Sequence, residues 1–107
     1  MKYYDLYGTR VMSAGNLAGA VASVLGISFN ARDSQFVGPY FHAASGDEIL
    51  DIELNDFPDR DEDELLEPDF ADYQVLLRVS RTERADEIRN RLGEIPGLDH
   101  LRRKTLE

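Results

Sequence analysis

The chain has 107 residues, of which 42% are hydrophobic, and a formal net charge of −9 at neutral pH. This length suits one folding unit, so we expect a single domain over residues 1–107. The lack of cysteine excludes disulfides, thiolate metal sites and cysteine nucleophiles, and it favours a reducing compartment. The acidic composition argues against nucleic acid or anionic lipid as a partner, because binding to either requires positive charge.

A strand and a helix are predicted at the start of the chain. Residues 2–10 are rich in tyrosine and favour a strand. Residues 14–25 are predicted to form a helix, because apolar residues recur at the spacing of one helix face: Leu17, Val21, Val24 and Leu25. Ser13 is suited to cap the first turn of this helix, and Gly26 is suited to end it in the left-handed conformation.

An antiparallel meander of strands is predicted next. Residues 27–31 and 35–44 favour strands separated by a turn at 32–34, and Pro39 indicates a bulge or an edge in the second of them. Residues 48–55 alternate between apolar and polar side chains, which is typical of a strand with one face in water. The outward positions of this strand are acidic: Asp51 and Glu53.

The second half begins with an acidic loop, predicted at about residues 56–72, and continues with a strand, a helix and a strand. Residues 73–79 form the most apolar of the predicted strands, so we expect them at the centre of the sheet. Thr82 is predicted to cap a helix over residues 83–95. Residues 98–103 predict a last strand, and the basic side chains at its end suit a sheet edge.

The order of these elements predicts an α+β fold of the ferredoxin-like type. Two β-α-β units separated by hairpin strands match a split β-α-β arrangement. We therefore expect an antiparallel sheet with two helices on one face and an extra β-meander.

Negative charge is concentrated in one stretch of the chain. Asp47–Asp72 holds thirteen acidic residues and one basic residue, Arg60, a net charge of −12, whereas the remainder sums to +3. Charge this dense repels itself and weakens a compact fold unless it serves a purpose. One interpretation is a solvated loop that maintains solubility. The other is a docking site, because an acidic patch attracts a basic partner and accelerates its association.

A calcium-binding loop is a further interpretation of the acidic run. Asp59, Asp61 and Asp63 have the spacing of the first three ligands of an EF-hand. The sixth position is Glu64 where the loop needs glycine, and the twelfth is Phe70 where it needs a bidentate glutamate. We therefore predict no specific calcium site.

Patterns typical of other metal sites and of catalysis are lacking in the sequence. The two histidines, His42 and His100, belong to no HxH or HExxH spacing. No serine lies in a GxSxG motif, and the glycines do not form a phosphate-binding loop. The sequence thus predicts no metal, no cofactor and no catalytic residue, and the protein is not expected to be an enzyme.

Four segments give the chain a family likeness: Gly38-Pro39-Tyr40-Phe41-His42, Asp47–Asp56, Tyr73–Val79 and Arg84–Leu98. With these segments the chain resembles the small, acidic, cysteine-free α+β immunity proteins that bacteria encode beside toxins, including those of contact-dependent inhibition systems. The resemblance implies a protein that binds a cognate toxin, often a basic nuclease, and blocks its active site or substrate channel. In such a complex carboxylates take the place of nucleic-acid phosphates.

We therefore predict a cytoplasmic immunity or inhibitor protein that neutralises a basic toxin domain by stoichiometric binding. An exported protein is not expected, because the first residues lack the apolar core of a signal peptide. The predicted contact residues are acidic side chains with two aromatic anchors: Asp51, Glu53, Asp56, Asp59, Asp61, Glu62, Asp63, Glu64, Tyr40 and Tyr73. Two alternatives stay open. One is a small-molecule-binding or catalytic domain with a cleft lined by Tyr3, Tyr7 or His42, and the other is a homo-oligomeric scaffold.

Overall fold

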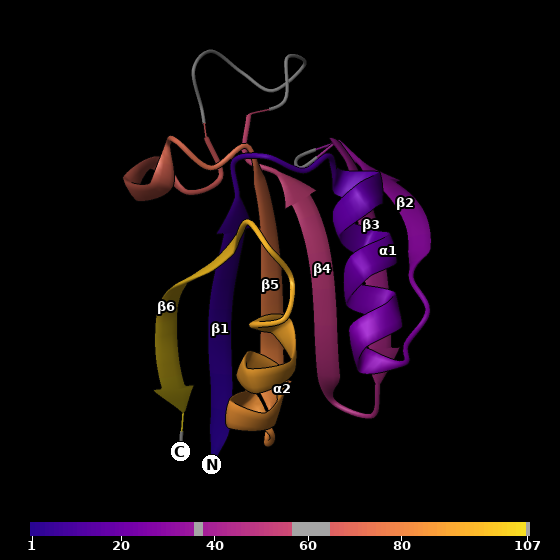
Figure 1. Cartoon of the computed structure of the whole chain (residues 1–107), viewed down its shortest axis with the longest axis vertical. Helices are drawn as coiled ribbons and strands as arrows, with labels where there is room; N and C mark the ends of the chain where they lie inside the picture. The colour runs from indigo at the N-terminus through magenta and orange to yellow at the C-terminus, as the bar shows by residue number, and fades with distance from the viewer. Residues whose placement is uncertain (36–37, 57–64, 107) are drawn as a thin grey trace.

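The computed structural model describes residues 1–35, 38–56 and 65–106, which form a six-stranded antiparallel sheet with two helices on one face (Figure 1). The elements in chain order are β1 (Lys2–Thr9), α1 (Ala14–Leu25), β2 (Asn30–Ser34), β3 (Gly38–Ser45), β4 (Glu48–Leu54), the 3-10 turn η1 (Pro68–Phe70), β5 (Val75–Thr82), α2 (Ala85–Leu92) and β6 (Leu98–Leu106). The predicted α+β class and antiparallel sheet are confirmed.

The strands lie in the order β2-β3-β4-β5-β1-β6, and all neighbouring pairs are antiparallel. The helix α1 leads from β1 to the edge strand β2, whereas α2 leads from β5 past β1 to β6, which is an edge strand as predicted (Figure 1). This order differs from that of a simple four-stranded ferredoxin fold. Within the described residues, neither helix is long and apolar enough to cross a membrane.

The hydrophobic core lies between the sheet and the helices. Because side chains alternate along a strand, β5 turns Val75, Leu77 and Val79 toward the helices from the middle of the sheet. The helices contribute four side chains that are at most 1% exposed: Leu17 and Val21 of α1, Ile88 and Leu92 of α2. Burial of each such side chain contributes about 1.5–3 kcal/mol. The central position that the apolar residues 73–79 predict for this strand is confirmed.

Both ends of α1 agree with the sequence prediction. Ser13 Oγ accepts a hydrogen bond from the Asn16 amide at 3.1 Å and so satisfies one of the free donors of the first turn. Gly26 follows the helix at φ 68°, in the left-handed region that glycine enters without steric penalty.

The first strand after α1 lies later in the chain than predicted. β2 occupies Asn30–Ser34, so the strand expected at 27–31 and the turn expected at 32–34 are wrong. The residues of β2 are small or polar, and pairing with β3, with Arg32 opposite Tyr40, holds the strand at the sheet edge. Backbone hydrogen bonds rather than buried side chains stabilise such a strand, so its side-chain pattern carries little signal.

The helix α2 is shorter than the predicted helix over 83–95. It spans Ala85–Leu92, and Arg84 at its N-cap makes no side-chain capping hydrogen bond. Thr82, the predicted cap, is the last residue of β5: its Oγ1 accepts from the Arg84 amide at 3.1 Å and donates to Glu48 Oε1 at 2.6 Å. The threonine hydroxyl therefore joins the ends of two strands, because a carboxylate on β4 is its acceptor.

Candidate partner-binding surface

Asp51 and Glu53 of β4 lie on the sheet face opposite the helices, and both are paired within the protein. Asp51 Oδ1 lies 2.6 Å from His42 Nδ1 on the neighbouring strand β3. Glu53 is only 9% exposed and accepts a hydrogen bond from Arg78 Nε of β5 at 2.6 Å. A carboxylate withdrawn from water needs such a partner. These two contacts therefore stabilise the fold, and both carboxylates are already paired before any partner protein binds.

A third carboxylate, Glu67, fastens the β4–β5 connection (residues 55–74) to the same face. Arg78 Nη2 lies 2.7 Å from Glu67 Oε2, and Arg102 Nη1 of β6 donates to Glu67 Oε1 at 2.9 Å. Burial by itself would raise the pKa of Glu67, but the hydrogen bonds from Arg102 and Arg78 outweigh burial and hold this pKa below its ordinary value. We refer to these contacts as the sheet-face pairs: Asp51–His42, Glu53–Arg78, Glu67–Arg78 and Glu67–Arg102.

Asn55 organises the base of the connection. Its side chain is 1% exposed; Oδ1 accepts from the Glu67 amide at 2.8 Å, and Nδ2 donates to the carbonyl groups of Phe70 at 3.0 Å and Tyr73 at 2.9 Å. An asparagine amide carries donors and an acceptor, so one side chain satisfies backbone groups that lack partners in a helix or sheet. The part of the connection from Leu66 to Tyr73 is therefore built into the fold.

The two predicted aromatic anchors make contacts within the protein. Tyr73 Oη donates to Asp99 Oδ2 at 2.8 Å, and its ring lies over Gly8, where an added Cβ would meet a ring carbon at 2.9 Å. Tyr40 is half-buried on β3, with its ring edge-on to that of His42 at a centroid distance of 6.4 Å. Glycine at position 8 is thus what allows the tyrosine ring to approach the sheet.

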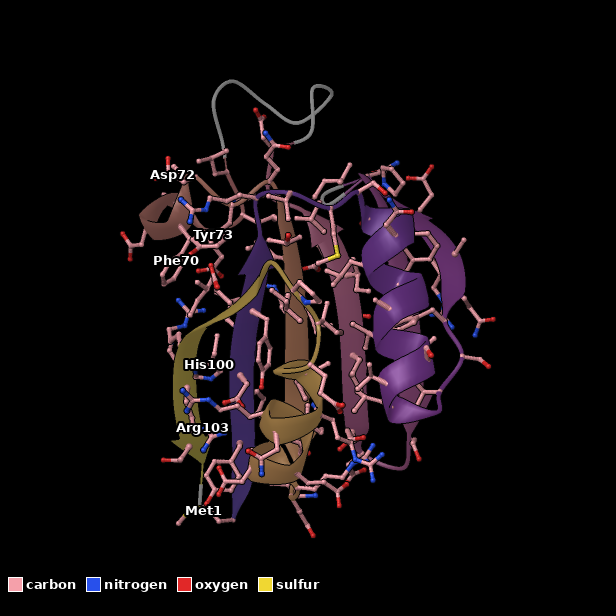
Figure 2. The ribbon with its side chains drawn as sticks, in the orientation of Figure 1. Met1, Phe70, Asp72, Tyr73, His100 and Arg103 are labelled. Carbon is pink, nitrogen blue, oxygen red and sulfur yellow. The ribbon has the colours of Figure 1, made fainter. Side chains whose placement is uncertain are left out.

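Three carboxylates of the connection differ from the sheet-face pairs. Asp56, Asp69 and Asp72 are exposed, and none of them has a cationic partner among residues 1–35, 38–56 and 65–106. Figure 2 shows Asp72 beside Phe70 and Tyr73 at the end of the sheet where the connection lies. We refer to Asp56, Asp69 and Asp72 as the connection carboxylates. Their charge is not neutralised by any side chain that the structure describes.

Five further predicted contact residues belong to the same connection but lie outside the described residues: Asp59, Asp61, Glu62, Asp63 and Glu64. The structure therefore divides the predicted surface into two parts. Tyr40, Asp51 and Glu53 lie together on the sheet face, since Tyr40 is opposite Glu53 in the register of β3 and β4. Asp56 and Tyr73 lie at the base of the connection instead.

The sequence prediction missed a buried polar cluster between β1, β6 and α2, where Figure 2 shows His100 and Arg103 on β6. Arg103 donates to both carboxylate oxygens of Asp5, at 2.8 and 3.0 Å, and to Asp86 Oδ1 of α2 at 2.8 Å. Burial lowers the pKa of His100, whose Nε2 lies 3.6 Å from Asp5 Oδ1. Burial also raises the pKa of Tyr7. The Asp5–Arg103 pair joins residues 98 positions apart, so no local pattern indicates it.

The metal-binding and catalytic interpretations can be compared with the described side chains. Within the described ranges, no three His, Asp or Glu side chains gather as a metal site requires. The catalytic alternative calls for a carboxyl group with a raised pKa, whereas hydrogen bonds from arginines hold the pKa of Glu48 and of Glu67 below its ordinary value. Tyr7, expected by that alternative to line a cleft, is 2% exposed and part of the core.

No protein-family model matches this chain, and no curated protein shows significant similarity to it. Its function is accordingly inferred from its own charges and contacts.

Proposed function

We propose that the chain is a non-enzymatic immunity or inhibitor protein that binds a basic partner, such as a toxin domain with nuclease activity. The contact would be made by the connection carboxylates together with the acidic residues that follow Asp56 in the sequence. The observation that carries this proposal is the difference between the two sets of acids. The sheet-face pairs are satisfied within the fold, whereas the connection carboxylates have no partner among the described side chains.

Long-range attraction is the physical basis of the proposed recognition. The chain has a net charge of −9, and its acidic stretch alone exceeds that value. Unpaired surface charges steer an oppositely charged protein toward them and raise its association rate by about 10- to 1,000-fold at low salt. Salt weakens the effect, because charges are screened over a Debye length of about 8 Å at physiological ionic strength.

The sheet-face pairs support this role indirectly. Glu67 is fastened by Arg78 and Arg102, and Asn55 fixes the backbone from which Asp69 and Asp72 project. A surface that is ordered before binding loses less conformational entropy in the complex. Inhibition then requires only that the carboxylates occupy the positions of nucleic-acid phosphates in the partner's channel, with no chemical step.

We also infer that the sheet is an enlarged ferredoxin-like fold. The four strands β6-β1-β5-β4 have the order and antiparallel pairing of a split β-α-β unit, and β2 and β3 extend this unit beyond β4. In this interpretation the meander is an insertion between α1 and β4. The β4–β5 connection then joins the two halves of the unit, and its described residues, 55–56 and 65–74, lie at one end of the sheet (Figure 1).

Co-expression tests the proposal. The full chain is produced together with the basic toxin domain that the proposal expects an adjacent gene to encode, and growth of the cells and the mass of the complex are measured. We expect the chain to restore growth and to form a complex of one copy of each protein. If the folded chain neither restores growth nor forms this complex, the proposed function is wrong.

A further inference from the structure

A hollow of about 500 Å³ lies beside the connection, between the β1–α1 link and the facing ends of β4 and β5. Figure 1 shows these segments at the end of the sheet where residues 55–56 and 65–74 lie. Much of its wall is apolar: Val11, Met12, Ala14, Leu54 and Val75. The exposed carboxylate of Asp56 belongs to the same wall. The hollow is thus continuous with the acidic surface of the proposed function.

Val11, at the rim of this hollow, is a large hydrophobic residue that is exposed to solvent. It is 77% exposed, and the other large hydrophobic side chain that is exposed in the described part of the chain is Met1, at 63%. Figure 2 shows Met1 at the opposite end of the molecule from the labelled residues of the connection. A single exposed apolar residue is ordinary on a protein surface, but Val11 adjoins the apolar wall of the hollow, and a contiguous apolar surface of this kind is suited to binding a partner.

The rim is also fixed in place. Thr9, which is fully buried, accepts hydrogen bonds through Oγ1 from the amides of Val11 at 3.2 Å and Met12 at 3.3 Å. On its other side Val11 lies against Gly97, where an added Cβ would be only 2.5 Å from Val11 Cγ2. The φ of 84° at this glycine is also one that other residues rarely adopt. The apolar rim is therefore held ready for a partner instead of being ordered by it.

We propose that this hollow receives an apolar side chain of the basic partner, one flanked by lysine or arginine residues. The inference rests on the proposed function, because the acids around the hollow select a basic segment. Asp56 lines the hollow itself, and Asp69 and Asp72 belong to the same connection. Arg10, the cation of the wall, lies over the Tyr73 ring at 5.3 Å from its centroid.

The two parts of the surface then have different effects on binding. Exposed carboxylates act over several ångströms and determine how fast the partner arrives. An apolar side chain that enters a hollow loses its contact with water and determines how slowly the partner leaves. Neutralising an acid should change the association rate and its salt dependence. Removing Val11 should change the dissociation rate at all salt concentrations.

Two acetylated peptides test the inference without knowledge of the partner. Each has six lysines, three on either side of one central residue, which is leucine in the first peptide and serine in the second. Their binding to the full chain at low ionic strength is followed by NMR of the methyl groups. We expect the leucine peptide to bind about ten-fold more tightly, as burial of part of a leucine side chain implies. It should also shift the methyl signals of Val11, Met12 and Leu54.

Two variants sharpen this test. Val11→Ser should abolish the preference for leucine while it leaves binding of the serine peptide unchanged. A chain that begins at Lys2 lacks the other exposed large apolar residue and should keep the preference. Equal affinity for the two peptides, with shifts confined to the connection, would overturn the apolar site and leave the proposed function intact. If neither peptide binds at low ionic strength, the proposed acidic docking site is itself wrong.

Discussion

The sheet face and the β4–β5 connection both carry acidic side chains, but those of the sheet face are paired with arginine or histidine, whereas the connection carboxylates are exposed. On the sheet face the side chains of Glu53 and Glu67 are 11% and 13% exposed, and both contact Arg78. At the connection Asp69 and Asp72 are exposed, with no cationic partner among the described residues. A buried carboxylate needs a partner to offset its lost hydration, whereas an exposed one keeps its charge in water. The first group therefore serves folding, and the second keeps the accessible charge that the proposed binding requires.

The largest effect on stability is expected from Arg78→Met, which tests whether the carboxylates of the sheet face are structural. This change leaves Glu53 without its arginine and removes one of the two cations that hold Glu67. We expect the free energy of unfolding, measured by urea denaturation, to fall by about 3 kcal/mol, because a poorly hydrated carboxylate loses its hydrogen bond from arginine. Adding Glu53→Gln to the variant should restore part of the loss.

Arg91→Met is the control for this prediction. Arg91 is an exposed arginine of α2 with no ion pair among the described residues, so its replacement should change stability by less than about 0.5 kcal/mol. Equal effects of Arg78→Met and Arg91→Met on the free energy of unfolding would mean that the sheet-face pairs do not stabilise the fold.

Asn55→Ala should have the next largest effect. The change removes the Asn55 partner of the Glu67 amide and of the Tyr73 carbonyl, and it removes one of the two donors to the Phe70 carbonyl. We expect a loss of about 2 kcal/mol in the free energy of unfolding and faster hydrogen exchange at the Glu67 amide. Asn90→Ala, at an exposed position of α2, is the matched control and should not destabilise the protein. Unchanged exchange at Glu67 would show that Asn55 does not hold the connection.

Acid should act on the structural groups in two ranges of pH. Burial lowers the pKa of His100 below 6.5, so the unfolded chain takes up this proton first and the histidine's contribution is lost as the pH falls below that value. Hydrogen bonds from arginines lower the pKa of Glu48 and of Glu67 below 4.5, so their contribution is present above 4.5 and is lost as the pH falls further.

The two ranges are separated by comparing variants with wild type in unfolding experiments between pH 8 and pH 3. The stability difference between wild type and His100→Gln should change mainly below pH 6.5, and that between wild type and Glu67→Gln mainly below pH 4.5. A difference that stays constant with pH would contradict the assigned role of the group concerned.

The smallest effect on stability is expected at the connection. Replacing Asp69 and Asp72 together by asparagine removes two exposed charges with no cationic partner in the described part of the chain. We expect the free energy of unfolding to change by less than about 0.5 kcal/mol, as for other exposed substitutions. A loss above about 1.5 kcal/mol in urea denaturation would place these acids among the structural ones.

Elements that local chemistry determines were predictable from the sequence. Ser13 and Gly26 delimit α1 as expected, and the apolar residues of β5 lie at the sheet centre. The boundaries of β2 and α2 were missed, because partners remote in sequence decide them. The edge strand β2 depends on its pairing with β3. Thr82 belongs to β5, and its hydroxyl, which accepts from the Arg84 amide, also donates to Glu48 of β4, 34 positions away.

The division of the acids was not predictable for a similar reason. Alternation correctly places Asp51 and Glu53 on the face away from the helices, but it does not reveal Arg78 beside Glu53, 25 positions away. One of the two arginines that contact Glu67, Arg102, lies on β6, 35 positions away. A count of charges along the chain therefore does not distinguish the acids that stabilise the sheet from the acids that have no cationic partner among the described residues. Val11, in a short link between two elements, carried no periodic signal at all.

Association kinetics with the basic toxin domain that the proposal expects an adjacent gene to encode test the central claim most directly. Asp69→Asn with Asp72→Asn is compared with Asp33→Asn and Glu94→Gln, a pair of exposed acids elsewhere whose removal changes the net charge equally. We predict that the first pair lowers the association rate about ten-fold at low salt and leaves the dissociation rate nearly unchanged, whereas the second pair has little effect. Equal rates for the two variants would contradict the account, because binding would then respond to total charge and not to the connection.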